Sequence, residues 1–578
     1  MKRKNDIFRF LCLTLLLMIG VGGLHAQVDY LCLTAETAYS TVKLRGVNMT
    51  ADFQVKKGTG DWENYTLGTI ITLEAIGDKV YFKGNYKGLG TSKFIKFDMY
   101  GKISASGNVM TLTDGDIPTT SLAGKDYCFC FLFQACAALT TAPELPATTL
   151  APCCYSNMFW GCDNLTTAPT LPATTLANYC YEGMFKSCTG LTALPNLPAT
   201  IMAEGCYYYM FQGCTGLTEA PTLPTTTLAK SCYKEMFRDC TELTTPPTLP
   251  VTTLAESCYE GMFRGCTGLK AAPKLSATTL APDCYYSMFR ECTGLTTAPE
   301  LPAITMVDGC YGRMFEDCTK LTTAPELPAT TLADYCYGWM FSGCTGLTTA
   351  PELKATQMAV HCYNEMFGNC TGLTTAPELP AKNLDEGCYC GMFAGCTSLK
   401  TPPELPATTL ADYCYEAMFI YCDSLTTAPV LPATTLTISC YYMMFQGCTE
   451  LTTAPLLPAK TLAKTCYQRM FNGCSKLNNI KVNFTAWNEA ENSTQNWVEG
   501  VSATGTFTCP AGLDTTLKDA SHVPVGWTVD ITTGINTPVV DKNQLDPKGI
   551  MYNLSGQRVD ENYKGIVIQN GKKYLKKH

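Results

Sequence analysis

The sequence predicts an α/β repeat solenoid of about fourteen 26-residue units, each a short strand plus a short helix. Three observations predict this architecture. A unit with two cysteines recurs fourteen times at a constant step of 26 residues, without an insertion between copies. Apolar residues recur at helical spacing inside each unit. A segment ending in proline follows them, and this pattern is typical of a short strand that ends at its prolines. We expect an all-β domain before the solenoid and a small β tail after it.

Residues 1–26 are predicted to be a secretory signal peptide. The chain opens with Lys2, Arg3 and Lys4. An apolar run then reaches about Leu24, and Leu-His-Ala predicts cleavage after Ala26. The run is too short for a transmembrane helix and no second run follows, so we expect an exported chain that does not span a membrane.

Residues 27–118 lack the repeat and are predicted to form a small β domain of the sandwich type. The stretches "TVKLRGV", "DFQVKK" and "KVYFKGN" alternate or cluster residues that favour strands. The turn-forming stretches "GTGDWENY" and "AIGDK" separate them.

Residues 119–477 carry the fourteen copies, and the copy that begins at Cys336 serves here as the reference copy. The equivalents of Phe341 and Leu347 are invariant, and the methionine before the phenylalanine is replaced only once, by Leu132. One unit cannot bury its apolar stripe alone, so neighbouring units must stack and share a core. The predicted repeat core of the reference copy consists of Cys336, Met340, Phe341, Cys344 and Leu347.

This pattern resembles the BspA-like leucine-rich repeats found in surface proteins of oral and gut anaerobic bacteria. The residues that carry the resemblance are Phe341, Cys344, Leu347 and Leu353, and it extends over about 122–477. The unit is longer than usual by about one helical turn, which carries the first cysteine. The resemblance implies a leucine-rich-repeat solenoid, an outer-membrane-associated or secreted location and a role in surface attachment or host contact. It implies no catalytic residues.

The paired cysteines have three interpretations. Buried free thiols are favoured because free cysteine is among the most buried residues. Disulfides are possible in an exported chain, although eight residues of helix span about 12 Å, beyond disulfide reach. Zinc is least favoured, because structural zinc ligands cluster as C-x2-4-C pairs. We therefore expect no metal and no other cofactor. After loss of Cys12, the 33 remaining cysteines form an odd number, so at least one thiol is free or pairs between chains.

The C-terminal region is predicted to hold three parts. Residues 478–531 contain three of the six tryptophans and form a cap that shields the last unit. Residues 532–549 form a linker. Residues 550–578 form a β tail with two strands around Ser555-Gly556-Gln557. The tail resembles C-terminal secretion or surface tails of the same bacteria; alternatively, its lysine-rich ending is only a soluble terminus.

Two features of the repeats are candidates for binding. The first is a set of aromatic residues at positions that vary between copies, where exposed rings on a rigid array suit protein or glycan contact. These residues are Trp160, Tyr208, Tyr209, Tyr286, Trp339 and Tyr442. The second is an acidic ladder after the strand proline in five successive copies. It consists of Glu300, Glu326, Glu352, Glu378 and Glu404.

Composition and motifs disfavour several function classes. The formal net charge is −8 and no basic block could follow a phosphate backbone, so we expect no nucleic-acid partner. The mature histidines His361, His522 and His578 are far apart in the sequence. The sequence has no phosphate loop, no G-x-S-x-G and no H-E-x-x-H motif, so we expect no enzyme.

The leading hypothesis is a secreted or surface-held adhesion protein whose array contacts a host or bacterial surface protein or glycan. The alternative is a passive stalk or surface-layer element that presents residues 27–118.

Overall fold

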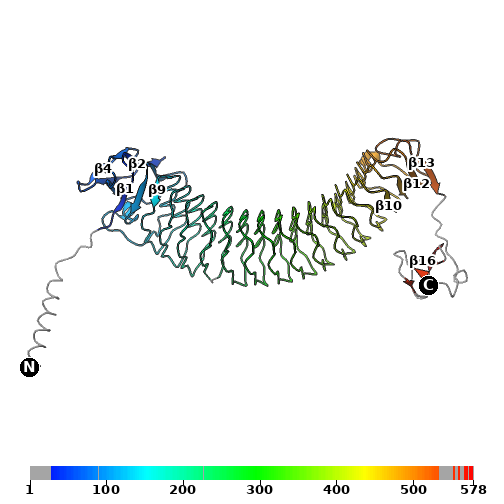
Figure 1. Cartoon of the computed structure of the whole chain (residues 1–578), viewed down its shortest axis with the longest axis horizontal. Coiled ribbons are helices and arrows are strands. Elements are labelled where there is room, and N and C mark those ends of the chain that lie inside the picture. The colour runs from blue at the N-terminus through cyan, green and yellow to red at the C-terminus, as the bar shows by residue number, and fades with distance from the viewer. Residues whose placement is uncertain are drawn as a thin grey trace, which may run out of the picture.

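The computed structural model describes residues 28–532 except 89, 225 and 226, together with four short strands of the tail. The predicted signal peptide lies outside the described residues, as does the predicted linker beyond its first residue. In Figure 1 the repeats form a long arch between the N-terminal strands and strands β10 to β13. Among the described residues, no helix has the length and apolar character needed to cross a membrane.

The predicted N-terminal β region is confirmed, and it consists of two sheets. A six-stranded sheet has the order β4-β3-β6-β1-β8-β9, and a three-stranded sheet has the order β5-β2-β7. The sheets share one core, and the Tyr65 hydroxyl of one sheet donates a hydrogen bond to the Leu44 carbonyl of the other across 3.1 Å. The strands are β1 (Leu31–Ala35), β2 (Ser40–Val47), β3 (Phe53–Lys57), β4 (Glu63–Tyr65), β5 (Ile71–Leu73), β6 (Lys79–Gly84), β7 (Phe94–Tyr100), β8 (Ile103–Ser106) and β9 (Leu139–Thr141). A single helical turn, α2 (Thr111–Asp114), follows β8.

The N-terminal region closes the first end of the array. Strand β9 belongs to the first repeat copy, yet it pairs in parallel with β8. The Phe97 ring of β7 stacks on Phe133 of the first copy at 5.2 Å, and the Phe97 carbonyl accepts a hydrogen bond from the Cys136 thiol at 3.0 Å. These contacts are the ones that each copy makes with the next, so the N-terminal sheets act as the cap of the solenoid.

The repeat solenoid is confirmed, but the helix predicted in each unit is wrong. The segment from the residue before the first cysteine to the second cysteine, 335–344 in the reference copy, is a series of tight turns, which we call the turn segment. Every fourth residue has a positive φ: 54° at Tyr335, 55° at Trp339 and 74° at Gly343. Residues in this left-handed region interrupt an α-helix. An apolar stripe at every fourth residue therefore arises here from four-residue turns.

Backbone hydrogen bonds of the turn segment join neighbouring copies. The N–H groups of Tyr337, Trp339 and Phe341 donate to carbonyls of the next copy at 3.1, 2.7 and 2.9 Å. The alternate N–H groups donate to the carbonyl three residues back, as Met340 does to Tyr337 at 3.2 Å. In an α-helix all these N–H groups would donate to carbonyls of the same segment. The turns thus give each copy a row of hydrogen bonds to its neighbour, while the proline-ended segments add isolated parallel bridges such as Leu327 to Leu353.

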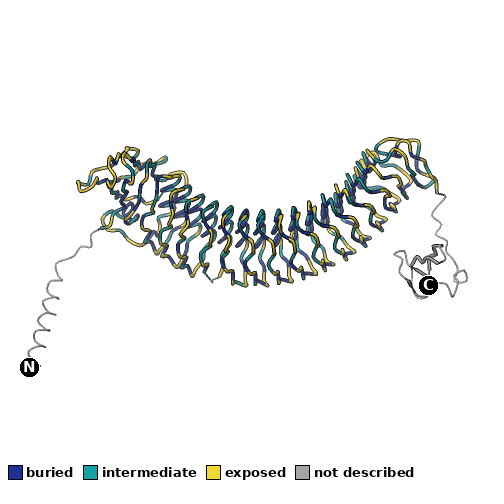
Figure 2. The backbone as a smooth tube through the Cα atoms, viewed as in Figure 1, coloured by how far each residue is buried: buried dark blue, intermediate teal, exposed yellow. Residues whose placement is uncertain are grey.

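The core consists of side-chain ladders that run through the whole array, and Figure 2 shows buried residues in every coil from end to end. The five predicted core residues of the reference copy have no exposed surface. Tyr337 stacks on Tyr363 at 5.8 Å and Phe341 stacks on Phe367 at 5.7 Å. Stacked aromatic rings add to the free energy gained by burying their apolar area.

The described residues hold 33 cysteines, 32 of them buried, and the cysteines of the repeats are free thiols. From the second copy on, the second cysteine of each copy donates its thiol proton to the phenylalanine carbonyl of the copy before it, as Cys344 does to Phe315 at 3.0 Å. Burial raises the pKa of the Cys344 thiol and that of Cys136, the latter to about 12. A thiol with a raised pKa holds little of the reactive thiolate form at neutral pH. The structure therefore agrees with the buried-thiol interpretation.

The C-terminal end repeats the same backbone in degenerate form. Asn492, Asn496 and Gly500 have φ values of 51°, 54° and 75°, which continue the every-fourth pattern beyond the fourteenth copy. The Phe471 N–H donates to the carbonyl of the fully buried Trp497 at 2.8 Å. A parallel sheet lies beside these turns and consists of β10 (Thr453–Leu457), β11 (Asn479–Val482), β12 (Thr506–Pro510) and β13 (Thr528–Thr532). A short 3-10 helix, η1 (Glu489–Glu491), precedes the last turns.

The tail forms a separate antiparallel sheet with the order β15-β14-β16-β17. Its strands are β14 (Met551–Tyr552), β15 (Arg558–Val559), β16 (Gly565–Gln569) and β17 (Lys572–Lys576).

Candidate binding face

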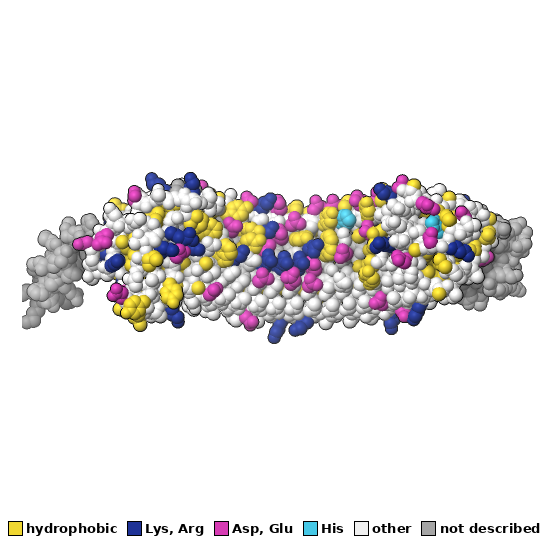
Figure 3. All heavy atoms as spheres, turned by 90° about the horizontal axis from the view of Figure 1, so that it is seen from above, with side chains coloured by type: hydrophobic (Ala, Val, Ile, Leu, Met, Phe, Trp, Pro, Cys, Tyr) yellow, Lys and Arg dark blue, Asp and Glu magenta, His cyan; other side chains and the backbone are white. Residues whose placement is uncertain are grey.

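The turn segments leave a row of side chains at the surface that differ from copy to copy. We call these partly exposed side chains of the turn segments the turn band. Figure 3 looks onto the concave side of the arch, where charged and hydrophobic side chains gather in a band and charges concentrate near its middle. The six aromatic residues predicted for binding all belong to turn segments and are half-buried. Each ring is therefore partly packed and partly open to solvent.

Three of the predicted aromatics form one continuous cluster with two lysines. The Lys186 ammonium lies 5.1 Å from the ring centre of Trp160 and 5.0 Å from that of Tyr209. Tyr209 stacks on Tyr208 at 3.9 Å, and the Lys234 ammonium lies 5.7 Å from the Tyr208 ring. Cation–π contacts of this kind hold the rings in place. Neither lysine was predicted from the sequence, although Lys186 occupies the same place in its copy as Trp160 does in the copy before.

The middle of the turn band carries a network of ion pairs between copies. Glu291 of one copy binds Arg264 of the copy before it at 3.1 Å and its own neighbour Arg290 at 3.2 Å. Arg290 also lies 3.2 Å from Glu316, which binds Arg313 at 3.0 Å. This network was not predicted from the sequence. Charges of opposite sign one repeat apart would have been the signal.

Two further predicted aromatics, Tyr286 and Trp339, lie near Arg313 at the centre of the array. The Arg313 guanidinium lies 4.3 Å from the ring centre of Trp339. Tyr286 and Trp339 line the same hollow of about 700 Å³ in the turn band. The stacked rings of Trp339 and Tyr335 reach on to His361, whose ring centre lies 5.1 Å from that of Tyr335. Tyr442 belongs to a later copy and is separate from both aromatic groups in the sequence.

The acidic ladder forms an exposed row and no single site. All five glutamates are exposed. Glu300 with Glu326, and Glu378 with Glu404, line proline-walled hollows of about 440 and 360 Å³. Glu352, in the middle of the row, is paired with Lys354 at 3.2 Å. The described part of the chain has no group of three or more His, Cys, Asp or Glu side chains that could hold a metal ion.

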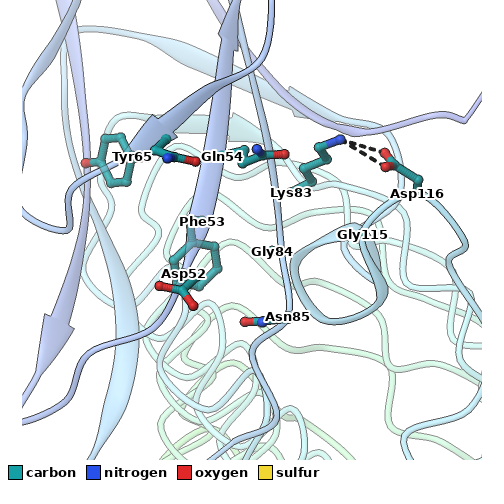
Figure 4. Close-up of a pocket in the computed structure, with 10 residues that line it drawn as sticks. Asp52, Phe53, Gln54, Tyr65, Lys83, Gly84, Asn85, Gly115 and Asp116 are labelled. Atoms are coloured by element: carbon teal, nitrogen blue, oxygen red, sulfur yellow. Dashed lines mark hydrogen bonds and ion pairs between the residues drawn. The ribbon is translucent and has the colours of Figure 1, made fainter.

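The N-terminal sheets carry a separate polar hollow of about 520 Å³, which Figure 4 shows. Asn64, Gln54 and Lys83 stand side by side on β4, β3 and β6, because the strand register places Gln54 opposite both of the others. The Lys83 ammonium binds Asp116 at 2.8 Å, and the Tyr30 hydroxyl donates to the same carboxylate at 2.6 Å. No site was predicted here from the sequence, although alternating polar residues on the strands were an available signal.

The model of the BspA type leucine rich repeat region matches the chain in overlapping segments, 153–296, 207–322, 308–452 and 362–490. Together these segments span more than half of the 578 residues. The chain belongs to the BspA-type leucine-rich repeat family. In this BspA-type array the matched residues include most of the turn band.

The comparisons with individual proteins add little. No curated protein matches the chain. One solved structure that matches is the crystal structure of the TLR13–ssRNA13 complex, at 12% identity and a TM-score of 0.22. The match covers 69% of this BspA-type chain and 53% of the TLR13 complex chain, about half of that chain's length. A TM-score this low carries no argument about the fold or the ligand.

Proposed function

We propose that this BspA-type protein is secreted or held at the bacterial surface, in association with the outer membrane, and binds a host or bacterial surface protein or glycan through its turn band. One observation carries the proposal: variation between copies concentrates in the turn band, whereas the core ladders are nearly constant. Trp160, Lys186 and Tyr209 come from three successive copies and form one cluster on this face. A support that served only to space two ends would need no such cluster.

The physical properties of the turn band suit recognition. The six predicted rings are half-buried and four of them contact a cation, so these rings lose little conformational freedom when a ligand binds. Aromatic and arginine side chains dominate the energy of protein interfaces. The backbone beneath is tied to both neighbouring copies, which keeps the spacing between successive side chains fixed.

The test uses the full chain, because removing the N-terminal sheets would expose the first copy. Immobilised matrix proteins, mucin and a glycan array are screened with the unchanged protein. The double variant Trp160→Ala/Tyr209→Ala is then compared with Tyr100→Ala, which removes an exposed ring from the N-terminal sheets. We expect the double variant to lose about tenfold or more in affinity and the control to bind normally. Equal binding by all three proteins contradicts the proposal.

The second candidate function is a stalk or surface-layer element that presents the N-terminal sheets, and the polar hollow in Figure 4 favours it. In that case the variant Gln54→Ala/Asn64→Ala loses binding and the Trp160→Ala/Tyr209→Ala variant keeps it. The acidic ladder remains a lesser proposal, as an exposed negative edge that could attract a cationic partner.

A further inference from the structure

The hollow in the turn band lies over the one copy that lacks side chains at two variable positions. These are the residue before the first cysteine and the second residue after it. In the eighth copy they are Gly309 and Gly312, and in no other copy are both glycine. The preceding copy has Asp283 and Tyr286 at these positions. Gly309, Asp283 and Tyr286 line the hollow of about 700 Å³.

The neighbouring copies provide the walls. The Asp283 carboxylate lies directly over Gly309, because a Cβ atom there would clash with its Oδ1. The Tyr286 ring covers Gly312, where a Cβ atom would stand 2.8 Å from its Cδ2. On the opposite side Tyr335 and Trp339 are nearly parallel, with an angle of 2° between their rings. The hollow therefore has an aromatic ring on each side and a carboxylate over its glycine floor.

The charges around the hollow do not balance. Lys234 is paired with Glu260 at 2.8 Å, and Arg313 is paired with Glu316 at 3.0 Å. Asp283 and Asp308, which also line the hollow, have no ion pair among the described residues. Burial, and then the nearby charge of Glu260, raises the pKa of the Asp283 carboxyl. The charge of Lys234 offsets the half-buried charge of Asp283 only in part, and a cationic ligand placed against the carboxylate would lower its free energy further.

We propose that this hollow binds the basic side chain of a lysine or arginine from a protein partner, between Tyr286 and the Tyr335–Trp339 pair and against Asp283 and Asp308. This inference rests on the proposed function and names the chemistry of its partner. A metal ion is a poor occupant, because the described residues contain no group of three suitable ligands. Aromatic walls suit the flat guanidinium or the alkyl stem of such a side chain. Arg313 on Trp339 already shows the same contact within the chain.

The test is calorimetric titration of the full chain with the peptide acetyl-Gly-Arg-Gly-Arg-Gly-amide, its lysine analogue and its glutamate analogue. The main variant is Asp283→Asn/Asp308→Asn; asparagine tolerates the positive φ of residue 283. The matched control is Glu219→Gln/Glu242→Gln, which removes the same charge from exposed positions outside the turn segments. Tyr335→Ser removes a wall without a change of charge, and serine stands at the equivalent positions 231 and 257. Thermal melts check that every variant is folded.

We expect the two basic peptides to bind and the glutamate peptide not to bind. The Asp283→Asn/Asp308→Asn variant should weaken the basic peptides by about tenfold or more, Tyr335→Ser by about threefold or more, and the control by less than about twofold. Failure of the unchanged protein to bind either basic peptide overturns the inference, as does equal binding by the main variant and the control. The same variants are tested on the ligands of the binding screen. If a protein ligand loses affinity for the Trp160→Ala/Tyr209→Ala variant but binds the Asp283→Asn/Asp308→Asn variant normally, this inference alone is overturned. If the ligand binds the Trp160→Ala/Tyr209→Ala variant normally as well, the proposed function is overturned.

Discussion

The Cys344 thiol donates its proton to the carbonyl oxygen of Phe315 in the preceding copy, 3.0 Å away. The same carbonyl also accepts the N–H of Cys318 in its own copy, at 3.0 Å. The second cysteine is therefore a buried hydrogen-bond donor between copies. This explains why a small apolar residue such as alanine does not take its place in any copy.

Replacing this donor should destabilise the array locally. We expect Cys344→Ala to lower the free energy of unfolding by about 1–3 kcal/mol, because it leaves a small cavity and one fewer donor for the Phe315 carbonyl. Cys390→Ala, which changes a half-buried cysteine outside the two ladders, is the control and should cost less. Hydrogen exchange of the flanking copies measures the difference, and equal effects of the two substitutions would contradict this role.

The raised thiol pKa values make stability depend on pH at the alkaline end. Buried thiols stay protonated in the folded chain, whereas unfolded thiols ionise near their ordinary value of 9.0. The stabilisation is thus fully present below about pH 9 and is lost as the pH rises toward about 12, the value for Cys136. We expect the melting temperature to fall steadily over this range, with a parallel rise in thiol labelling. A melting temperature that does not change between pH 8.5 and pH 11 would contradict the buried thiols.

Core and surface positions of one turn segment should differ sharply. Phe341→Ala empties a fully buried slot shared with the rings of both neighbouring copies, and we expect a loss of about 3–5 kcal/mol. Trp339→Ala removes a half-buried ring and its contact with Arg313, and we expect a loss of about 1 kcal/mol. Chemical denaturation of the two variants measures this difference, and equal losses would mean that the turn segment faces the other way.

The tail should affect where the protein is located, and it should not affect the stability of the repeat array. Deleting 550–578 removes a sheet that has its own strand pairing, so the melting temperature of the remaining chain should not change. If the tail is a surface signal, the deletion releases the protein from the cell surface, which fractionation measures. Unchanged surface retention would leave only the alternative of a soluble terminus.

The repeat and its core could be predicted because the spacing of 26 residues shows directly which residues stack. The local conformation could not, because a stripe at every fourth residue fits both a helix and a series of four-residue turns. The missed signal was the frequent glycine at every fourth position, such as Gly387, Gly391 and Gly395, which suits positive φ. The pairing of β8 with β9 and the hollow over Gly309 depend on contacts between separate segments, which periodicity within one copy does not reveal.

Hydroxyl-radical footprinting of the full chain, with and without the ligand found in the binding screen, shows directly whether the turn band is the binding face. The method labels accessible aromatic side chains, so Trp160, Tyr209 and Trp339 report on the turn band, and Trp62 and Tyr100 report on the N-terminal sheets. We expect the ligand to protect the three turn-band residues and to leave the other two unchanged. Protection of Trp62 or Tyr100 with no protection in the turn band would contradict it.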